Sequence, residues 1–174
     1  MKVIRDSIFE TNSSSCHSIV YSEKYKNSDS KESIKYHIYN DVLTVTPPDI
    51  GYHWNPELLF TCYDKLCYLI CFVADGIYSS DALNEELKNR DGKIPNIELL
   101  FTAVDLIKEK YNLDDVIIEY ESNSIPSIDH QSAGSDSFFN DKITENNMSD
   151  YLFDSSYIVV VDNDNTCYYD LDDF

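Results

Sequence analysis

No stretch of the sequence restricts the fold more than LCYLICFVA, residues 66–74. It lies in a longer segment that starts with Asn55, Pro56 and Glu57, residue types typical of the first turn of a helix. The apolar side chains that follow do not form one stripe but surround the predicted helix on most sides. Other elements must cover such a helix all round, because apolar surface in contact with water is unfavourable. We therefore expect a central, buried helix over residues 55–74.

The stretches on either side of this helix have the periodicity of further strands and helices. The predicted strands are residues 18–22, a hairpin over residues 34–46, residues 115–121 and a closing hairpin over residues 156–171. The other predicted helices are residues 80–90, residues 95–111 and one within residues 140–154. Strands, two large helices and then strands again predict an α+β fold, with a mainly antiparallel sheet packed on the two major helices. A length of 174 residues and a hydrophobic share of 43% fit a single domain over residues 1–174.

The charges of the chain are distributed unevenly. Residues 1–113 hold 17 acids and 12 bases, a net charge of −5, whereas residues 114–174 hold 15 acids and one base, a net charge of −14. A solvated surface normally carries both acidic and basic residues. The near absence of basic residues from about residue 114 onward therefore indicates that the negative charge has a function. Such a surface repels nucleic acid and anionic membranes and attracts a basic surface, typical of nucleic-acid-binding proteins. A simple excess of acid on a soluble protein is the alternative.

We expect the carboxylates after residue 113 to form a partner-binding surface on strands and a short helix. They are Asp114, Asp115, Glu119, Glu121, Asp129, Asp136, Asp141, Glu145, Asp150 and Asp154. Such carboxylates would meet lysines and arginines that otherwise hold the phosphates of a duplex, which carries one charge per ~1.7 Å of its axis. Aromatic residues between these acids could anchor apolar contacts in the interface. They include Tyr120, Phe138, Phe139, Tyr151 and Phe153.

The stretch FETNSSSCHS, residues 9–18, contains residue types that also perform catalysis. Ser15 and His17 would share one face of a strand and could act as a nucleophile and its base. No third residue that would orient the imidazole is identifiable, however. Small hydroxyl side chains favour a tight turn just before a strand, and we interpret the stretch in this way. A small hydrolase or nucleic-acid-processing enzyme that uses Ser15 and His17 is the alternative.

The sequence predicts no metal and no other cofactor. Cys67 and Cys71 lie one turn apart on the central helix and could supply half of a zinc site, but neither a Cys-x-x-Cys motif nor a histidine pair accompanies them. We therefore interpret them, together with Cys62, as core residues. Residues 162–173 have acids at some positions of a calcium loop but lack its glycine and its final glutamate. Five cysteines without a secretion signal at the start of the chain are expected to be reduced thiols in a cytoplasm.

The stretch FETNSSSCHS resembles the FETNSSS-x-HS opening of small uncharacterised proteins encoded by phages and other mobile elements of bacteria. The resemblance covers residues 9–18 and implies a bacterial host cell as the place of action, but no activity. In size, acidity and implied origin the chain also resembles anti-CRISPR proteins. That resemblance implies a non-enzymatic inhibitor of a CRISPR effector nuclease, which binds its basic nucleic-acid channel without touching nucleic acid or membrane. An acidic phage regulatory protein without a nuclease target is a further alternative.

Overall fold

The computed structural model describes residues 16–21, 33–50, 57–74, 77, 79–121, 126, 128 and 143–162. These residues form an α+β fold, as expected from the order of elements in the sequence. The strands are β1 (Cys16–Tyr21), β2 (Ile38–Tyr39), β3 (Val42–Val45), β4 (Glu57–Leu59), β5 (Asp115–Ile118) and β6 (Tyr157–Asp162). The α-helices are α1 (Cys62–Val73), α2 (Ser80–Asn89), α3 (Ile97–Tyr111) and α5 (Met148–Phe153), and η2 (Ser33–His37) is a 3₁₀ helix.

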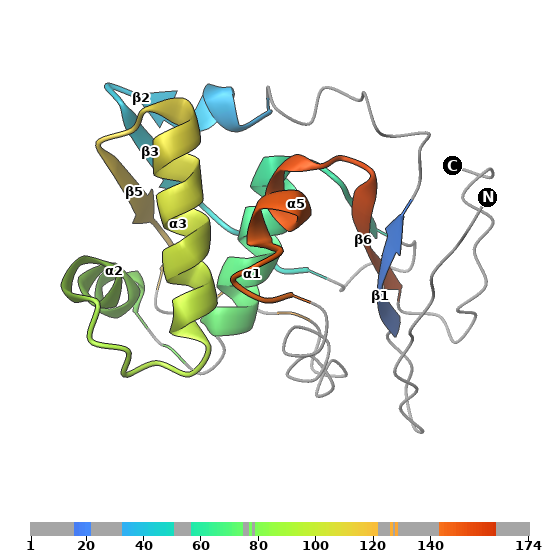
Figure 1. Ribbon diagram of the computed structural model, residues 1–174. Coiled ribbons are helices and arrows are strands. Elements are labelled where there is room, and N and C mark those ends of the chain that lie inside the picture. The colour runs from blue at the N-terminus through green and yellow to red at the C-terminus, as the bar shows by residue number, and fades with distance from the viewer. Residues whose placement is uncertain are drawn as a thin grey trace.

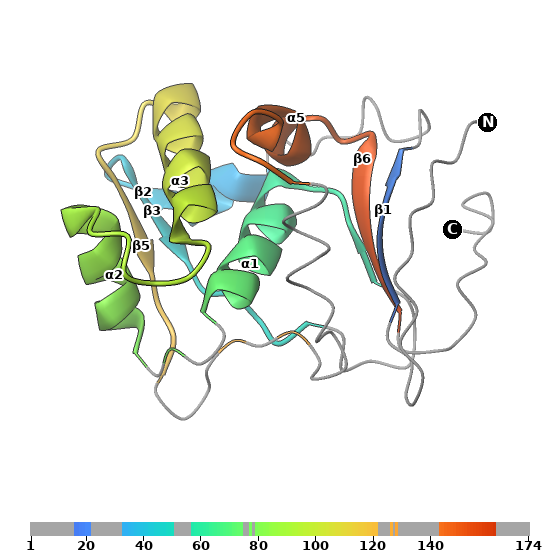
Figure 2. The same ribbon diagram turned by 60° about the horizontal axis from the view of Figure 1, so that its bottom comes forward.

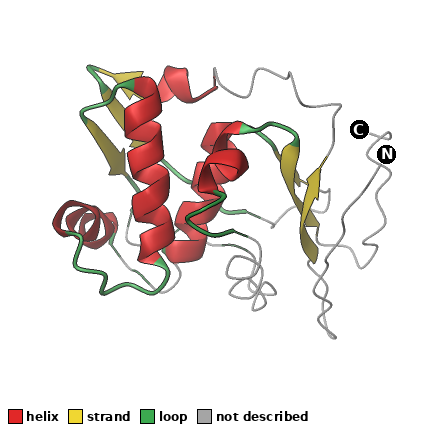
Figure 3. Cartoon of the chain, in the orientation of Figure 1, coloured by secondary structure: helices red, strands yellow, loops and turns green. Residues whose placement is uncertain are grey.

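The strands form two small sheets that lie on opposite sides of the helices (Figure 1; Figure 3). One sheet has the order β1-β6-β4 and the other the order β2-β3-β5. Pairing is antiparallel between β1 and β6, between β4 and β6, and between β2 and β3, whereas β3 and β5 are parallel. The prediction of mainly antiparallel pairing is confirmed, but the strands belong to two sheets instead of one.

Helix α1 is the central helix that the sequence predicts. It lies between the two sheets in both ribbon views and contacts α3, α5 and η2 (Figure 2). Leu66, Leu69 and Ile70 have no exposed surface, and the core around them extends from Ile34 to Val161. Within the described ranges, no helix has both the length and the apolar character needed to cross a membrane.

The predicted start of this helix at residue 55 is wrong, because residues 57–59 form strand β4 instead. Leu58 lies opposite Val160 of β6 in an antiparallel ladder. The helix itself begins after Thr61, whose Oγ1 accepts a hydrogen bond from the backbone N–H of Asp64 at 3.1 Å and donates one to the Asp64 carboxylate at 2.6 Å. Pairing with β6 therefore outweighs the local helix-start residues, and the first turn of α1 is fixed by a Thr-x-x-Asp cap.

The other predicted elements that the structure describes are present with shifted or shorter bounds, and the strand predicted at residues 18–22 is β1 at residues 16–21. The hairpin at residues 34–46 keeps its turn, since Asn40 and Asp41 have φ values of 50° and 61°, but its first half is the 3₁₀ helix η2. The two helices predicted at residues 80–90 and 95–111 are confirmed as α2 and α3. Strand β6 pairs with β1 and β4, and its predicted hairpin partner at residues 166–171 lies outside the described residues.

Strand β5 is an edge strand whose open side is closed by side chains. The Asn84 side chain of α2 donates to the carbonyl oxygen of Ile118 at 2.8 Å and accepts from its N–H at 2.9 Å. Ser80 Oγ donates to the carbonyl oxygen of Tyr120 at 3.2 Å. The amide of Asn84 thus takes the place that a neighbouring strand would have, and an edge covered in this way is protected from pairing with another chain.

Candidate partner-binding surface

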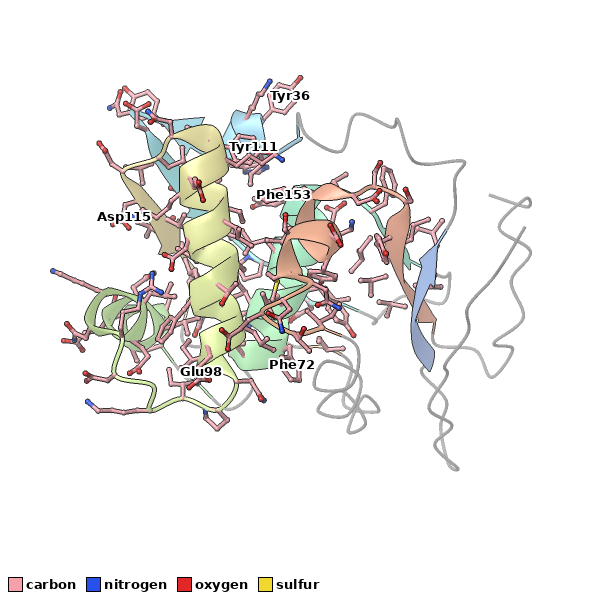
Figure 4. All side chains as sticks on the ribbon, viewed as in Figure 1. Tyr36, Phe72, Glu98, Tyr111, Asp115 and Phe153 are labelled. Atoms are coloured by element: carbon pink, nitrogen blue, oxygen red, sulfur yellow. The ribbon has the colours of Figure 1, made fainter. Side chains whose placement is uncertain are left out.

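The structure separates the predicted acidic residues into two groups. Asp114, Asp115, Glu119 and Glu121 lie in β5 or within three residues of it, and α3 stands between β5 and α5 in both ribbon views. The second group, at α5, is Glu145, Asp150 and Asp154. In Figure 4, the labelled Asp115 and the labelled Phe153 of α5 likewise lie on opposite sides of α3. The remaining predicted residues, Asp129, Asp136 and Asp141, lie outside the described residues.

The acids at β5 are exposed and held on a rigid backbone. The N–H of Asp114 donates to the carbonyl oxygen of Asp41 at 2.7 Å, and the N–H of Glu119 donates to that of Val45 at 2.9 Å. The strand alternates between exposed and buried residues, so Asp115 and Glu119 point to the same face. This local arrangement follows from the alternating sequence DVIIE, in which only every second side chain enters the core.

Asp115 also has contacts within the chain. Its Oδ1 accepts a hydrogen bond from the N–H of Val116 at 2.9 Å and lies 3.7 Å from Nζ of Lys108. The carboxylate is well exposed, and an ion pair between exposed groups contributes only about 0–1 kcal/mol. Lys108 therefore offsets the charge of Asp115 only in part.

At α5, one predicted carboxylate has a structural role. Oδ1 of Asp154 accepts hydrogen bonds from the N–H of Ser156 at 2.9 Å and from its Oγ at 2.5 Å, in the turn between α5 and β6. Asp154 is half-buried, whereas Glu145 and Asp150 are exposed. The α5 group thus presents two exposed carboxylates, Glu145 and Asp150, instead of the three that the sequence predicted.

Lys65 is a buried base that sequence reasoning missed. Its side chain has no exposed surface, and Nζ donates to the carbonyl oxygen of Asp154 at 2.8 Å, at the end of α5. In return, the Tyr151 hydroxyl donates to the carbonyl oxygen of Lys65 at 3.0 Å. Burial lowers the pKa of Lys65 to about 8, a shift that the nearby Cys62 and Asp154 oppose. The signal in the sequence was a single lysine inside a mostly apolar helix. The structure shows that this lysine holds α5 against α1.

The three helix cysteines are core residues, as predicted. Burial raises the pKa of the Cys62 and Cys67 thiols to about 12, and it also raises the pKa of the Cys71 thiol well above its usual value. Cys71 Sγ lies 3.4 Å from the carbonyl oxygen of Pro48 and donates to it. Thiolates, not thiols, bind metals and attack substrates, so these groups are inert. In the part of the chain that the structure describes, no group of three or more histidines, cysteines or acids could hold a metal ion.

The opening stretch runs into a strand, which is β1. In this strand, His17 lies opposite Val161 of β6 and Cys16 lies opposite Asp162. Ser15 and the predicted turn before the strand lie outside the described residues.

The predicted aromatic anchors that the structure describes are packed in or against the core. Tyr151 is buried, and the Tyr120 hydroxyl donates to the carbonyl oxygen of Ile77 at 3.2 Å. Phe153 meets the Tyr111 ring edge to face, with centroids 6.4 Å apart. Phe138 and Phe139 lie outside the described residues.

Among the described residues, the exposed aromatic side chains come instead from the segment around the first hairpin. Tyr36 and Tyr39 are 85% and 79% exposed, and Figure 4 shows Tyr36 projecting from η2 away from the helices. Between them in sequence, His37 stacks on Tyr63 of α1, with ring centroids 3.8 Å apart. The sequence signal was the run KYHIY, which carries more aromatic residues than a two-residue strand can bury.

No family model matches this chain, and no curated protein or solved structure matches it either. The function is therefore argued from the residues themselves.

Proposed function

We propose that this chain is a non-enzymatic inhibitor that binds the basic nucleic-acid channel of a bacterial CRISPR effector nuclease. It would act in the cytoplasm of the host cell and block the binding or cleavage of DNA or RNA. The observation that carries this proposal is the charge distribution, with 15 acids and one base over residues 114–174. A channel built for phosphates attracts a rigid acidic protein through the same lysines and arginines.

The exposed carboxylates around β5 support the proposal. Asp114, Asp115, Glu119 and Glu121 follow one another on or next to a strand whose backbone is fixed by β3 and α2. Fixed charges lose little freedom on binding, so more of the electrostatic attraction remains as affinity. Steering by such a field also speeds association, and both effects weaken as salt rises.

Titration of purified CRISPR effector–guide complexes with this protein tests the proposal. We expect cleavage of target DNA to fall to zero near one inhibitor per effector, with inhibition weakening between about 0.1 and 0.5 M salt because surface charges are screened. No effect on any CRISPR effector, in a panel of DNA- and RNA-targeting types, would contradict the proposal and favour the regulatory-protein alternative.

The same titration separates an inhibitor from an enzyme. An enzyme would inactivate a large excess of effector over time, whereas an inhibitor stops at its own molar amount. We expect the Ser15→Ala and His17→Ala variants to inhibit as well as the unchanged protein. Loss of inhibition in a folded variant, together with turnover at substoichiometric amounts, would support the alternative enzyme that uses these two residues.

A further inference from the structure

In the part of the chain that the structure describes, one face of the β2-β3-β5 sheet has no element over it. α3 contacts the sheet from one side and α2 lies along the edge of β5, so the opposite face is open (Figures 1 and 2). The buried residues of β3 and β5 point toward the helices. The opposite side, here called the outer sheet face, consists of Tyr39, Val42, Thr44, Asp115, Ile117 and Glu119.

Two large apolar side chains remain exposed on the outer sheet face. Tyr39 is 79% exposed and Ile117 is 37% exposed. Parallel strand pairs such as β3 and β5 are usually covered on both faces, and here the helices cover only one. Tyrosine is also among the residues that most often carry the binding energy of protein interfaces. The outer sheet face therefore has suitable anchors for a protein contact.

The anchors are held in place before any partner arrives. Tyr39 immediately precedes the turn at Asn40 and Asp41, whose positive φ values belong to a tight two-residue hairpin turn. Ile117 lies in the middle of the β5 ladder, opposite Thr44. A surface whose backbone is already ordered loses little entropy on binding.

The charges of the outer sheet face decide which kind of partner fits. Asp115 and Glu119 lie two positions to either side of Ile117, about 7 Å along the strand in each direction. Among the six residues of the face none is a base, and the nearby Lys108 contacts Asp115 from α3. A second copy of this chain, a nucleic acid or an anionic membrane would bring like charges together. Lysines and arginines around an apolar recess would complement the face.

The mode of contact follows from the edge of β5. Asn84 and Ser80 already bond to the groups of Ile118 and Tyr120 that a strand from a partner would need. A partner therefore contacts side chains on the face and does not extend the sheet at this edge.

We propose that the outer sheet face is the docking surface of this chain, and that its partner is a protein with a basic surface around an apolar recess. The class of partner rests on the proposed function. The location of the surface rests on the exposed anchors and acids alone. Tyr39 and Ile117 supply the apolar contact, and Asp115 and Glu119 supply the charge.

Two double variants and a matched control test the proposal. The anchor variant is Tyr39→Ala with Ile117→Thr, which keeps a β-branched residue in the strand. The charge variant is Asp115→Lys with Glu119→Lys. The control, Glu85→Lys with Glu109→Lys, makes the same change of net charge at exposed helix positions. Circular dichroism and thermal unfolding establish that each variant is folded.

Binding is measured first to an effector that the unchanged protein inhibits. We expect the anchor and charge variants to weaken binding at least about tenfold each, as loss of interface hot spots does, and the control to change it less than about threefold. The loss in the charge variant should shrink at high salt, whereas the loss in the anchor variant should persist. Equal binding by all three folded variants would overturn the proposal.

A second probe, a peptide of ten arginines, keeps the test independent of any effector. We expect amide NMR signals of residues 115–119 to shift on titration with this peptide, and the charge variant to remove those shifts while the control keeps them. If no effector is inhibited but these shifts occur, the proposed function fails and the docking surface stands. Shifts confined to other acids would overturn the docking surface. So would shifts of the same residues when the protein alone is concentrated, because they would assign the face to a second copy.

Discussion

At the scale of single residues, the buried Lys65 makes stability depend on pH. Taking an ammonium group out of water is unfavourable, and this burial is the main cause of its lowered pKa. One hydrogen bond to the end of α5 and the adjacent Tyr151 ring, whose centroid lies 5.9 Å from Nζ, compensate only in part. The fold therefore keeps a charge in its core at neutral pH, at the contact between α1 and α5.

The lowered pKa of Lys65 predicts a rise of stability with pH. Between pH 8 and 10.5 the unfolded chain binds this proton and the folded chain releases it, so folding becomes more favourable as pH increases. The buried thiols have the opposite effect from about pH 8 onward, because their pKa values are raised from 9.0 on folding. Their effect offsets the gain from Lys65 in the unchanged protein, so the contribution of Lys65 is measured as a difference between variants. From pH 8 to pH 9, the free energy of unfolding should change by about 1 kcal/mol more in favour of the folded state in the unchanged protein than in Lys65→Met. The exposed control Lys88→Met should behave as the unchanged protein does.

The Thr61 cap predicts a further effect at residue scale. Thr61→Ala removes the acceptor for the Asp64 N–H and should lower the free energy of unfolding by about 0.5–2 kcal/mol. Thr61→Ser keeps the oxygen and should restore most of the loss. An unchanged stability in Thr61→Ala would mean that the first turn of α1 does not depend on this cap.

At the scale of elements, the limits of a helix or strand were predictable where the local sequence alone determines them. Asn96 and Asn112 bound α3 in left-handed conformations, and the apolar period between them is undisturbed, so its limits could be predicted to within a residue or two. The start of α1 could not, because Leu58 and Leu59 suit either a helix or a strand. Their partners in β6 lie about a hundred residues further along the chain. Local sequence carries no signal for such a distant pairing.

The same limit explains the division into two sheets and the covered edge of β5. Nothing in the sequence around Asn84 indicates that its side chain bonds to Ile118, 34 residues further along the chain. The candidate surface was predictable where alternation in DVIIE set the face of each acid. It was not predictable at α5, where the carboxylate of Asp154 accepts a hydrogen bond from the N–H of Ser156.

The edge role of Asn84 gives a prediction at the scale of elements. Asn84→Ala leaves the N–H and carbonyl oxygen of Ile118 without their side-chain partner and should destabilise the protein by about 1–3 kcal/mol. Hydrogen exchange of the Ile118 amide should accelerate, whereas the exposed control Asn89→Ala should leave it unchanged. Unaltered exchange at Ile118 in Asn84→Ala would show that another group protects this edge.

At the scale of the whole molecule, the main property is the negative charge, most of which lies after residue 113. The net charge of −19 alone would suit any acidic protein. What distinguishes this chain is that acids in and next to β5 flank an exposed isoleucine, on a sheet face that no described element covers. Charge complementarity with a phosphate-binding channel and apolar contact at the same place would give both fast and specific association.

The proposed inhibitor would occupy the same channel as nucleic acid. The direct measurement is the apparent affinity of fluorescently labelled target DNA for an inhibited CRISPR effector–guide complex, at increasing concentrations of this protein. We predict pure competition, in which the apparent dissociation constant of the DNA rises in proportion to the protein concentration without a limit. A plateau at high protein concentration, with DNA, effector and this protein in one ternary complex, would contradict the proposed inhibition.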